Sequence, residues 1–126
     1  MRRVTLPGVT DPNLPLTPGI VAGNLVFVSG QVPRRRDGSW IDGPIEAQVE
    51  SVLNNLEAVL KEAGSSLDKL CSVRVYLTDP NDFAAFNDAY RTRLGSYGFP
   101  ARTTLVSSLV TPPEVRIEVD AIAELA

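Results

Sequence analysis

The apolar run Leu25-Val26-Phe27-Val28 restricts the architectures open to this chain. It follows Gly23-Asn24, a pair typical of a type I′ hairpin turn, so residues 19–22 and 25–31 are predicted to form two paired strands. The second strand is apolar without alternation. Strands of that kind are usually buried on both faces, and we therefore expect both faces of its sheet to be covered.

Hydrophobic periodicity predicts one α+β fold for the whole chain. Asp42 or Gly43 is the expected cap of the first helix, and Gly64 is placed to end it. The predicted helices span residues 44–63 and 80–94, and the predicted strands span residues 3–6, 19–22, 25–31, 71–77, 99–106 and 114–123. The order is β-β-β-α-β-α-β-β, which favours two helices packed on one face of a mixed sheet.

Two helices cover only one face of a sheet, and a chain of 126 residues has nothing left to cover the other. Self-association is the simplest way to bury that second face. The length suits a single domain over residues 1–126. No apolar run approaches the ~20 residues of a membrane helix, and no apolar signal core follows the basic N-terminus. We therefore expect a cytoplasmic protein.

Composition excludes several kinds of chemistry. The chain contains no histidine and one cysteine, Cys71, which excludes internal disulfides, ordinary zinc, haem or iron–sulfur sites, and Ser-His-Asp or Cys-His catalysis. No metal is expected, and proton transfer would have to come from Asp, Glu, Tyr, Lys or water. The net charge of −3 and the pI of about 4.9 give no electrostatic footprint for nucleic acid.

The strongest candidates for chemistry lie on the last two predicted strands. Arg102 and Thr104 share one face of the first strand, because side chains alternate, and Glu118 lies on the polar face of the second. The prolines at 112 and 113 require a turn between the two strands, so we expect a hairpin-like unit that can bring Arg102 and Glu118 together. Arginine can grip a carboxylate by two hydrogen bonds, and a partly desolvated glutamate can move a proton. The pattern alone favours an ordinary cross-strand ion pair.

Other residues have both a structural and a functional interpretation. Ser29 and Gly30 can donate a hydroxyl and backbone N–H groups to a small anion, but a strand that ends in a bulge is more common. Asn87 lies among aromatics on the inner face of the second helix, where a helix-to-loop hydrogen bond is the alternative. Cys71 is predicted to lie in the core. The arginines at 34–36 predict a solvated turn more than an RNA contact.

Three separated blocks closely resemble the RidA/YjgF family, also described as endoribonuclease L-PSP or translation inhibitors. The blocks are Gly23-Asn24-Leu25-Val26-Phe27-Val28-Ser29-Gly30-Gln31-Val32-Pro33, Asn81-Asp82-Phe83-Ala84-Ala85-Phe86-Asn87-Asp88-Ala89-Tyr90, and Pro100-Ala101-Arg102-Thr103-Thr104 with Val115-Arg116-Ile117-Glu118-Val119-Asp120-Ala121-Ile122-Ala123. The likeness runs from about Pro15 onward. It implies a chorismate-mutase-like fold and a homotrimer with sites between subunits.

Better-known members of that family hydrolyse reactive enamine and imine acids to 2-keto acids and ammonia, and the resemblance implies the same for this chain. Arg102 matches the arginine that holds the substrate carboxylate, and Glu118 matches the glutamate credited with water activation. Ser29 and Gly30 match positions that line the pocket, and Asn87 matches a commonly shared asparagine nearby. The reaction needs no metal or organic cofactor, because an imine is already electrophilic.

Two pocket positions depart from the family's pattern. Leu16 stands where many deaminase members have tyrosine, and Thr104 stands where the family often has cysteine; Leu16 makes the expected pocket more apolar. Three other functions stay open: a pathway-specific deaminase of an aminoacrylate or aminomuconate, a non-catalytic binder of small carboxylates, and an endoribonuclease. The acidic pI and the absence of histidine count against the last of these.

Overall fold

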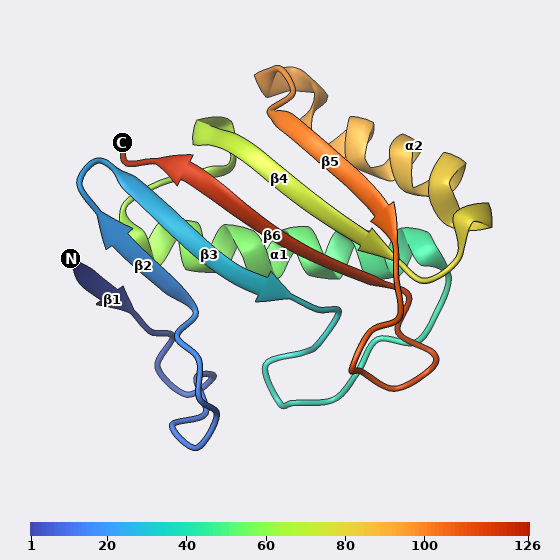
Figure 1. The fold of residues 1–126 in the computed structure, drawn as a ribbon, viewed down its shortest axis with the longest axis horizontal. Coiled ribbons are helices and arrows are strands. Elements are labelled where there is room, and N and C mark those ends of the chain that lie inside the picture. The colour runs from blue at the N-terminus through green and yellow to red at the C-terminus, as the bar shows by residue number, and fades with distance from the viewer.

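The computed structural model describes residues 1–126 and confirms the predicted order of elements (Figure 1). The two α-helices are α1 (Ile45–Ala63) and α2 (Phe83–Leu94). The strands are β1 (Arg2–Val4), β2 (Gly19–Ala22), β3 (Leu25–Gln31), β4 (Leu70–Leu77), β5 (Ala101–Val106) and β6 (Ile117–Glu124). Neither helix is long and apolar enough to span a membrane.

The strands form one mixed sheet in the order β1-β2-β3-β6-β4-β5, and both helices lie on the same side of it (Figure 1). We call that side the helix face and the other side the open face. Strand β6 shows the difference clearly, because Ile117, Val119 and Ala121 are buried on the helix face. The alternate residues Glu118 and Asp120 lie on the open face and are only half-buried. The prediction of two helices on one face of a mixed sheet is therefore confirmed.

The expected hairpin of the last two strands is wrong. Strand β5 pairs in parallel with β4, and β6 pairs with β3 and β4, so β4 lies between β5 and β6. Two parallel neighbours need a crossover connection, and α2 provides it between β4 and β5. The proline-rich segment after β5 therefore carries the chain across β4 instead of making a tight hairpin.

Strand β3 is covered on one face only within a single copy of the chain. Val26 and Val28 belong to the buried core. Leu25 and Phe27 point the other way and remain 36% and 42% exposed. The open face therefore presents apolar side chains that nothing in the same copy covers.

Two local predictions are wrong for backbone reasons. Gly23 has φ = +60°, but no residue other than glycine has a positive φ. A type I′ turn needs positive φ at both central residues, so the turn at Gly23-Asn24 follows the type II′ pattern. Cys71 is exposed and not in the core. The β4–β6 register shifts between Leu70 and Ser72, which makes Cys71 the extra residue of a bulge.

A buried glutamine ties the start of α1 to the start of β6. Pro44 is the N-cap, without a side-chain cap bond, so Asp42 and Gly43 do not cap the helix as predicted; Gly64 ends it with φ = +88° as expected. Gln48, fully buried, instead donates its amide to the carbonyls of Gly43 (3.1 Å) and Glu114 (2.9 Å). Its oxygen accepts from the N–H of Arg116 at 2.8 Å.

Replacing Gln48 by leucine is expected to lower the free energy of unfolding by about 3 kcal/mol, because three backbone groups would lose a buried partner. Urea unfolding measures the change. Asn54→Leu, at an exposed position of the same helix, should stay within about 0.5 kcal/mol of the unchanged protein. Equal losses in both variants would mean that the network around Gln48 contributes little.

Candidate functional site

The predicted site residues fall into two groups on opposite faces of the sheet. Arg102 pairs in register with Val73, which is buried on the helix face. Glu118 pairs with Tyr76 on the open face. Because β4 also separates the two strands, Arg102 and Glu118 of one copy do not meet. We call Leu16, Ser29, Gly30 and Glu118 the glutamate group, and Asn87, Arg102 and Thr104 the arginine group.

A bulge at the end of β3 brings the glutamate group together. The β3–β6 register shifts between Val28 and Gln31, so Ser29 and Gly30 lie in the irregular segment. A Cβ built on Gly30 would clash with the carboxylate of Glu118, so a larger residue there would have to displace that side chain. Ser29 is held by two bonds to the preceding loop: its N–H donates to the carbonyl of Pro18 and its hydroxyl to that of Thr17.

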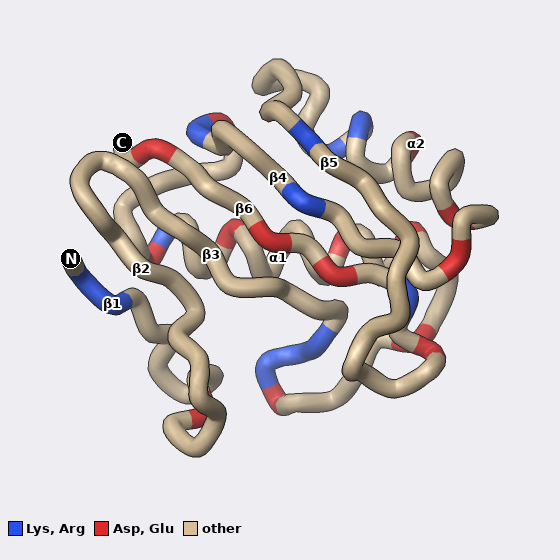
Figure 2. The backbone as a smooth tube through the Cα atoms, in the orientation of Figure 1, with Lys and Arg blue, Asp and Glu red and all other residues tan.

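Glu118 is the carboxyl of the open face whose pKa is shifted upward. Its pKa is raised, first by burial and then by the negative charge of Asp120. Asp120 is engaged elsewhere, since it accepts from Nε of Arg74 at 2.7 Å and from the hydroxyl of Tyr76 at 2.9 Å. Figure 2 shows this arrangement as acidic positions on β6 beside a basic position on β4. Glu118 itself has no ion pair.

The raised pKa of Glu118 predicts a pH-dependent stability difference. The folded state binds this proton more tightly than the unfolded chain, so the contribution to stability is present below the ordinary value of 4.5 and is lost as pH rises through the raised pKa. Glu118→Gln stays neutral. It should therefore resist urea better than the unchanged protein at about pH 7, and the two should converge below about pH 4. A difference that is the same at both pH values would contradict the raised pKa.

Gly30→Ala tests the contact between Gly30 and Glu118 directly. The added methyl would displace the carboxylate, and a misplacement of about 1 Å can cost up to about a hundredfold in rate. We expect at least a tenfold loss of any activity that depends on Glu118, with the fold retained by circular dichroism. Gly43→Ala, where a Cβ would meet nothing within 4 Å, is the control. Full activity in Gly30→Ala would mean that the reaction does not depend on the position of the Glu118 carboxylate.

An aromatic surface on α2 holds the guanidinium of Arg102. Its central carbon lies 4.9 Å from the ring centre of Tyr90, 5.1 Å from Phe86 and 5.9 Å from Phe83. Cation–π contact positions an arginine without neutralising it, and Arg102 forms no ion pair. The cross-strand ion pair that the pattern favoured is therefore absent.

Asn87 and Arg102 line one cavity of about 260 Å³ between α2 and the start of β5. Tyr90 also lines it, and its buried hydroxyl has no hydrogen-bond partner. Burial raises the pKa of that hydroxyl, against the opposing effect of Arg102. Thr104 is half-buried two residues after Arg102 and on the same side of β5. Two members of the arginine group, Asn87 and Arg102, therefore share a cavity in which Arg102 is the unpaired cation, and Thr104 does not line it.

Sequence reasoning missed the residues that support each group. Arg74, Tyr76 and Asp120 surround Glu118 on the open face. Alternation within β4 and β6 could have placed them on a polar face, but only the pairing of those two strands brings them side by side. The aromatics around Asn87 were predicted for the inner face of the second helix; Phe86 and Tyr90 are buried there, but Phe83 is 43% exposed. Their contact with Arg102 was not predicted.

The three arginines that follow β3 bond mainly within their own turn, in agreement with the solvated turn predicted from the sequence. Arg34 lies 4.8 Å above the ring of Trp40, and its Nε donates to the carbonyl of Gly38 at 2.8 Å. Arg35 donates to the carbonyl of Trp40 at 2.8 Å. None of the three forms an ion pair.

A two-helix mixed sheet with this strand order is also the fold of solved structures of small proteins. A model of the Endoribonuclease L-PSP family matches residues 10–125. The chain belongs to this family.

Relatives with curated names support the assignment. A RutC family protein of Pyrococcus abyssi is 41% identical over 110 residues, which cover 86% of this chain and 85% of that protein. The mitochondrial protein mmf2 of Schizosaccharomyces pombe is 39% identical over 111 residues, or 86% of each chain. A protein of Dermatophagoides farinae named 2-iminobutanoate/2-iminopropanoate deaminase is 30% identical over 122 residues, or 96% of this chain and 94% of the relative.

Solved structures share the fold over nearly the whole chain. Yeast Mmf1 superimposes with a TM-score of 0.89 at 31% identity and covers 99% of this chain and 98% of its own. The YjgF gene product of E. coli gives 0.88 at 28% identity, with 98% of both chains covered. E. coli TdcF with bound serine gives 0.89 at 26% identity, with both chains covered completely. The fold that the RidA/YjgF resemblance implied is therefore confirmed.

Proposed function

We propose that this protein hydrolyses small reactive 2-imino and enamine acids to 2-keto acids and ammonia. The observation that carries the proposal is the state of Glu118, a half-buried carboxyl with a raised pKa, no ion pair and a place over Gly30. A raised pKa suits a group that must both take and return a proton near neutral pH. The Dermatophagoides farinae relative is named 2-iminobutanoate/2-iminopropanoate deaminase. E. coli TdcF, which is similar in structure, has been solved with serine bound.

The site would be completed by a second copy of the chain. Arg102 and Glu118 lie on opposite faces of one sheet, so a substrate that uses both must lie between copies. Contact between unlike surfaces closes into a ring when the rotation permits, and we propose the homotrimer that the family resemblance implies. Leu25 and Phe27 are exposed on the open face, and burying these apolar side chains against another copy would stabilise the assembly.

In the proposed reaction Arg102 of one copy holds the substrate carboxylate by two hydrogen bonds, and Glu118 of another copy acts on water. The Glu118 carboxylate takes a proton as the water oxygen bonds to C2 of the iminium acid, and the C=N electron pair moves to nitrogen. The protonated Glu118 then gives its proton to the amine. The Glu118 carboxylate takes the proton of the new hydroxyl group as the C–N bond breaks, so the 2-keto acid forms, and the departing ammonia carries that proton away as ammonium. The residues of this chain supply positioning and proton transfer.

An assay with imines formed in place tests the proposed reaction. An amino-acid oxidase converts alanine or 2-aminobutyrate to the 2-imino acid, and semicarbazide traps the imine that has not been hydrolysed. We expect the trapped imine to fall when the protein is added, with matching formation of keto acid. Identical trapping with and without the protein, for both amino acids, would overturn the proposal.

Mixed oligomers test whether the site lies between copies. Arg102→Ala and Glu118→Gln should each retain about 1% of the activity or less when alone. After the two are unfolded, mixed in equal amounts and refolded together, about a quarter of the interfaces would combine an intact arginine with an intact glutamate, if assembly is random. About a quarter of the original activity should therefore return. Mass spectrometry would show that the mixtures contain both variants. If activity does not return in such mixtures, Arg102 and Glu118 do not act together in one site between copies.

A binder of small carboxylates is the second candidate function. The uncompensated charge of Arg102 in its cavity favours it, because such a site would hold a keto acid without any turnover. Binding lost in Arg102→Ala, with no imine hydrolysis by the unchanged protein, would support this function. The alternative of RNA cleavage has less support, since the Arg34 and Arg35 side chains are bound to their own turn. A cytoplasmic location remains a prediction, and mmf2 is named a mitochondrial protein.

A further inference from the structure

Two carboxyl groups lie close together on the open face of β6. Glu118 and Asp120 are both half-buried, and side chains at their spacing point to the same face of a strand, about 7 Å apart. Two carboxylates at this distance repel each other, so one of them binds a proton more tightly than an isolated carboxyl group does. The partners of each group decide which one binds it.

Strand β4 places a hydrogen-bond donor on each oxygen of Asp120. Arg74 stands across from Asp120 in the register, and its Nε donates to Oδ1 at 2.7 Å. Tyr76 stands across from Glu118, but its hydroxyl donates to Oδ2 of Asp120 at 2.9 Å. These bonds are the main reason why the pKa of the Tyr76 hydroxyl and the pKa of the Arg74 guanidinium are raised. Hydrogen bonds of this kind stabilise a carboxylate in its charged form, so the negative charge at Asp120 is held in one place.

Glu118 lacks such partners in the same copy. It forms no ion pair, and the tyrosine that stands opposite it bonds to Asp120. Burial and then the charge of Asp120 raise the pKa of Glu118. Of the two carboxyl groups, Glu118 is therefore the better proton acceptor.

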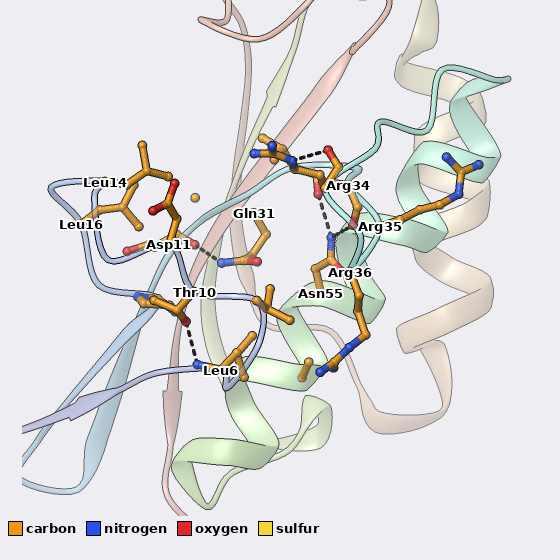
Figure 3. A pocket seen from close by; sticks show the side chains of 17 residues that line it. Leu6, Thr10, Asp11, Leu14, Leu16, Gln31, Arg34, Arg35, Arg36 and Asn55 are labelled. Carbon is orange, nitrogen blue, oxygen red and sulfur yellow. Dashed lines mark hydrogen bonds between the residues drawn. The ribbon is translucent and has the colours of Figure 1, made fainter.

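The β3 side of Glu118 brings no charged group to it. Gly30 lies against the carboxylate, and Gln31 donates its amide to the carbonyl of Ser29 at 3.0 Å (Figure 3). The arginines of the turn after β3 line a cavity of about 270 Å³ (Figure 3), which Glu118 does not line. In the proposed oligomer Arg102 of another copy would add a positive charge, and that charge is the same in all the variants of the test. Within one copy, the charges that act on Glu118 therefore come from β4 and β6.

We propose that Arg74 and Tyr76 are positioning residues of the reaction: they hold the Asp120 carboxylate beside Glu118 and so leave the proton of the open face to Glu118. This role rests on the proposed function, in which Glu118 takes a proton from water and returns it. Arg74 and Tyr76 act through Asp120 and not on the substrate. Different surroundings of two neighbouring carboxyl groups are a general way to give them different roles in acid–base chemistry.

Carbon NMR of protein labelled at the glutamate carboxyl follows the titration of Glu118, whose signal is the one missing in Glu118→Gln. We expect a single step in the unchanged protein. Asp120→Asn removes the neighbouring negative charge, so the step should move to lower pH. Arg74→Gln combined with Tyr76→Phe should let Asp120 share the proton, and the Glu118 curve should then split into two steps. A Glu118 curve that is the same in all these proteins would overturn the proposal.

Two further variants serve as controls for the titration. Glu124→Gln removes a charge from the same strand about 20 Å from Glu118, where salt screens it, so the curve should not change. A shift as large as that in Asp120→Asn would assign the effect to net charge and overturn the proposal. Tyr76→Phe alone keeps the ring and should broaden the step. It gives the same test if the double variant does not fold, and an unchanged curve in it would then overturn the proposal.

The pH profile of the reaction gives a second readout. In Asp120→Asn the acid limb of kcat should move to lower pH, and the plateau above it should fall by about threefold, because a weaker base accepts a proton less readily. A rate lowered equally at every pH would show a merely structural role and overturn the proposal. If no imine is hydrolysed, the proposed function fails, but the NMR titration still decides the role of Arg74 and Tyr76. If imine is hydrolysed and the Glu118 curve never changes, only this role fails.

Discussion

Glu118→Gln is expected to lower kcat for imine hydrolysis by about a thousandfold, within the range that general acid–base catalysis contributes. Glutamine keeps the shape of the side chain over Gly30 but cannot take a proton from water. The structure around it should survive, since Glu118 forms no ion pair that the change would break. Steady-state rates with imine formed in place measure the loss.

The best control for Glu118→Gln lies on the same strand. Glu124 is exposed, and its position on β6 differs from that of Glu118 by an even number of residues, so the two point to the same side. Glu124→Gln removes an equal charge and should change kcat by less than about twofold. Equal losses in the two variants would mean that net charge, and not the Glu118 carboxylate, supports the reaction.

The pH profile gives a second measurement on Glu118. The carboxylate form must be present to accept a proton from water, so activity should fall as pH falls through the pKa of Glu118. Burial and Asp120 raise that pKa above its ordinary value of 4.5, and the acid limb of the profile should lie correspondingly higher. In Glu118→Gln the limb should disappear from the residual activity. If the acid limb persists in Glu118→Gln, a titratable group other than Glu118 causes it.

Arg102→Ala is expected to lower kcat/KM by about a hundredfold or more, because truncating one partner of a hydrogen-bonded charge pair costs roughly 2–5 kcal/mol. Keto-acid affinity should fall by a similar factor, which calorimetry can measure without turnover. Arg102→Lys should recover only part of the loss, since an ammonium cannot make the two parallel bonds of a guanidinium. The aromatic surface of α2 remains in both variants, so stability should change little.

Arg91→Ala is the matched control for Arg102→Ala. Arg91 lines the same cavity, but its charge is already paired with Asp88 at 3.0 Å. Its removal should cost about threefold at most. If Arg91→Ala and Arg102→Ala lose affinity equally, a diffuse positive field would explain binding better than a carboxylate held by Arg102.

Local sequence patterns predicted the helices and strands, but they did not predict which strands pair across long distances in the chain. Alternation in β6 put Glu118 on the polar face, and helical spacing put Phe86 and Tyr90 on the inner face of α2, both correctly. The pair Gly23-Asn24 located the β2–β3 turn but not its type, because positive φ at Gly23 alone is enough to close it. Cys71 was misplaced because a bulge shifts the register of β4 against β6 by one residue.

The sequence by itself determined the order of strands and helices, the buried side of β6, and a chemistry without histidine. Only the tertiary structure decided that Arg102 and Glu118 lie on opposite faces. The physical reason is that periodicity records which side of a strand is apolar but not which strand pairs beside it. Parallel pairing of β5 with β4, through the crossover at α2, placed β4 between β5 and β6 and so separated the two residues that the sequence had brought together.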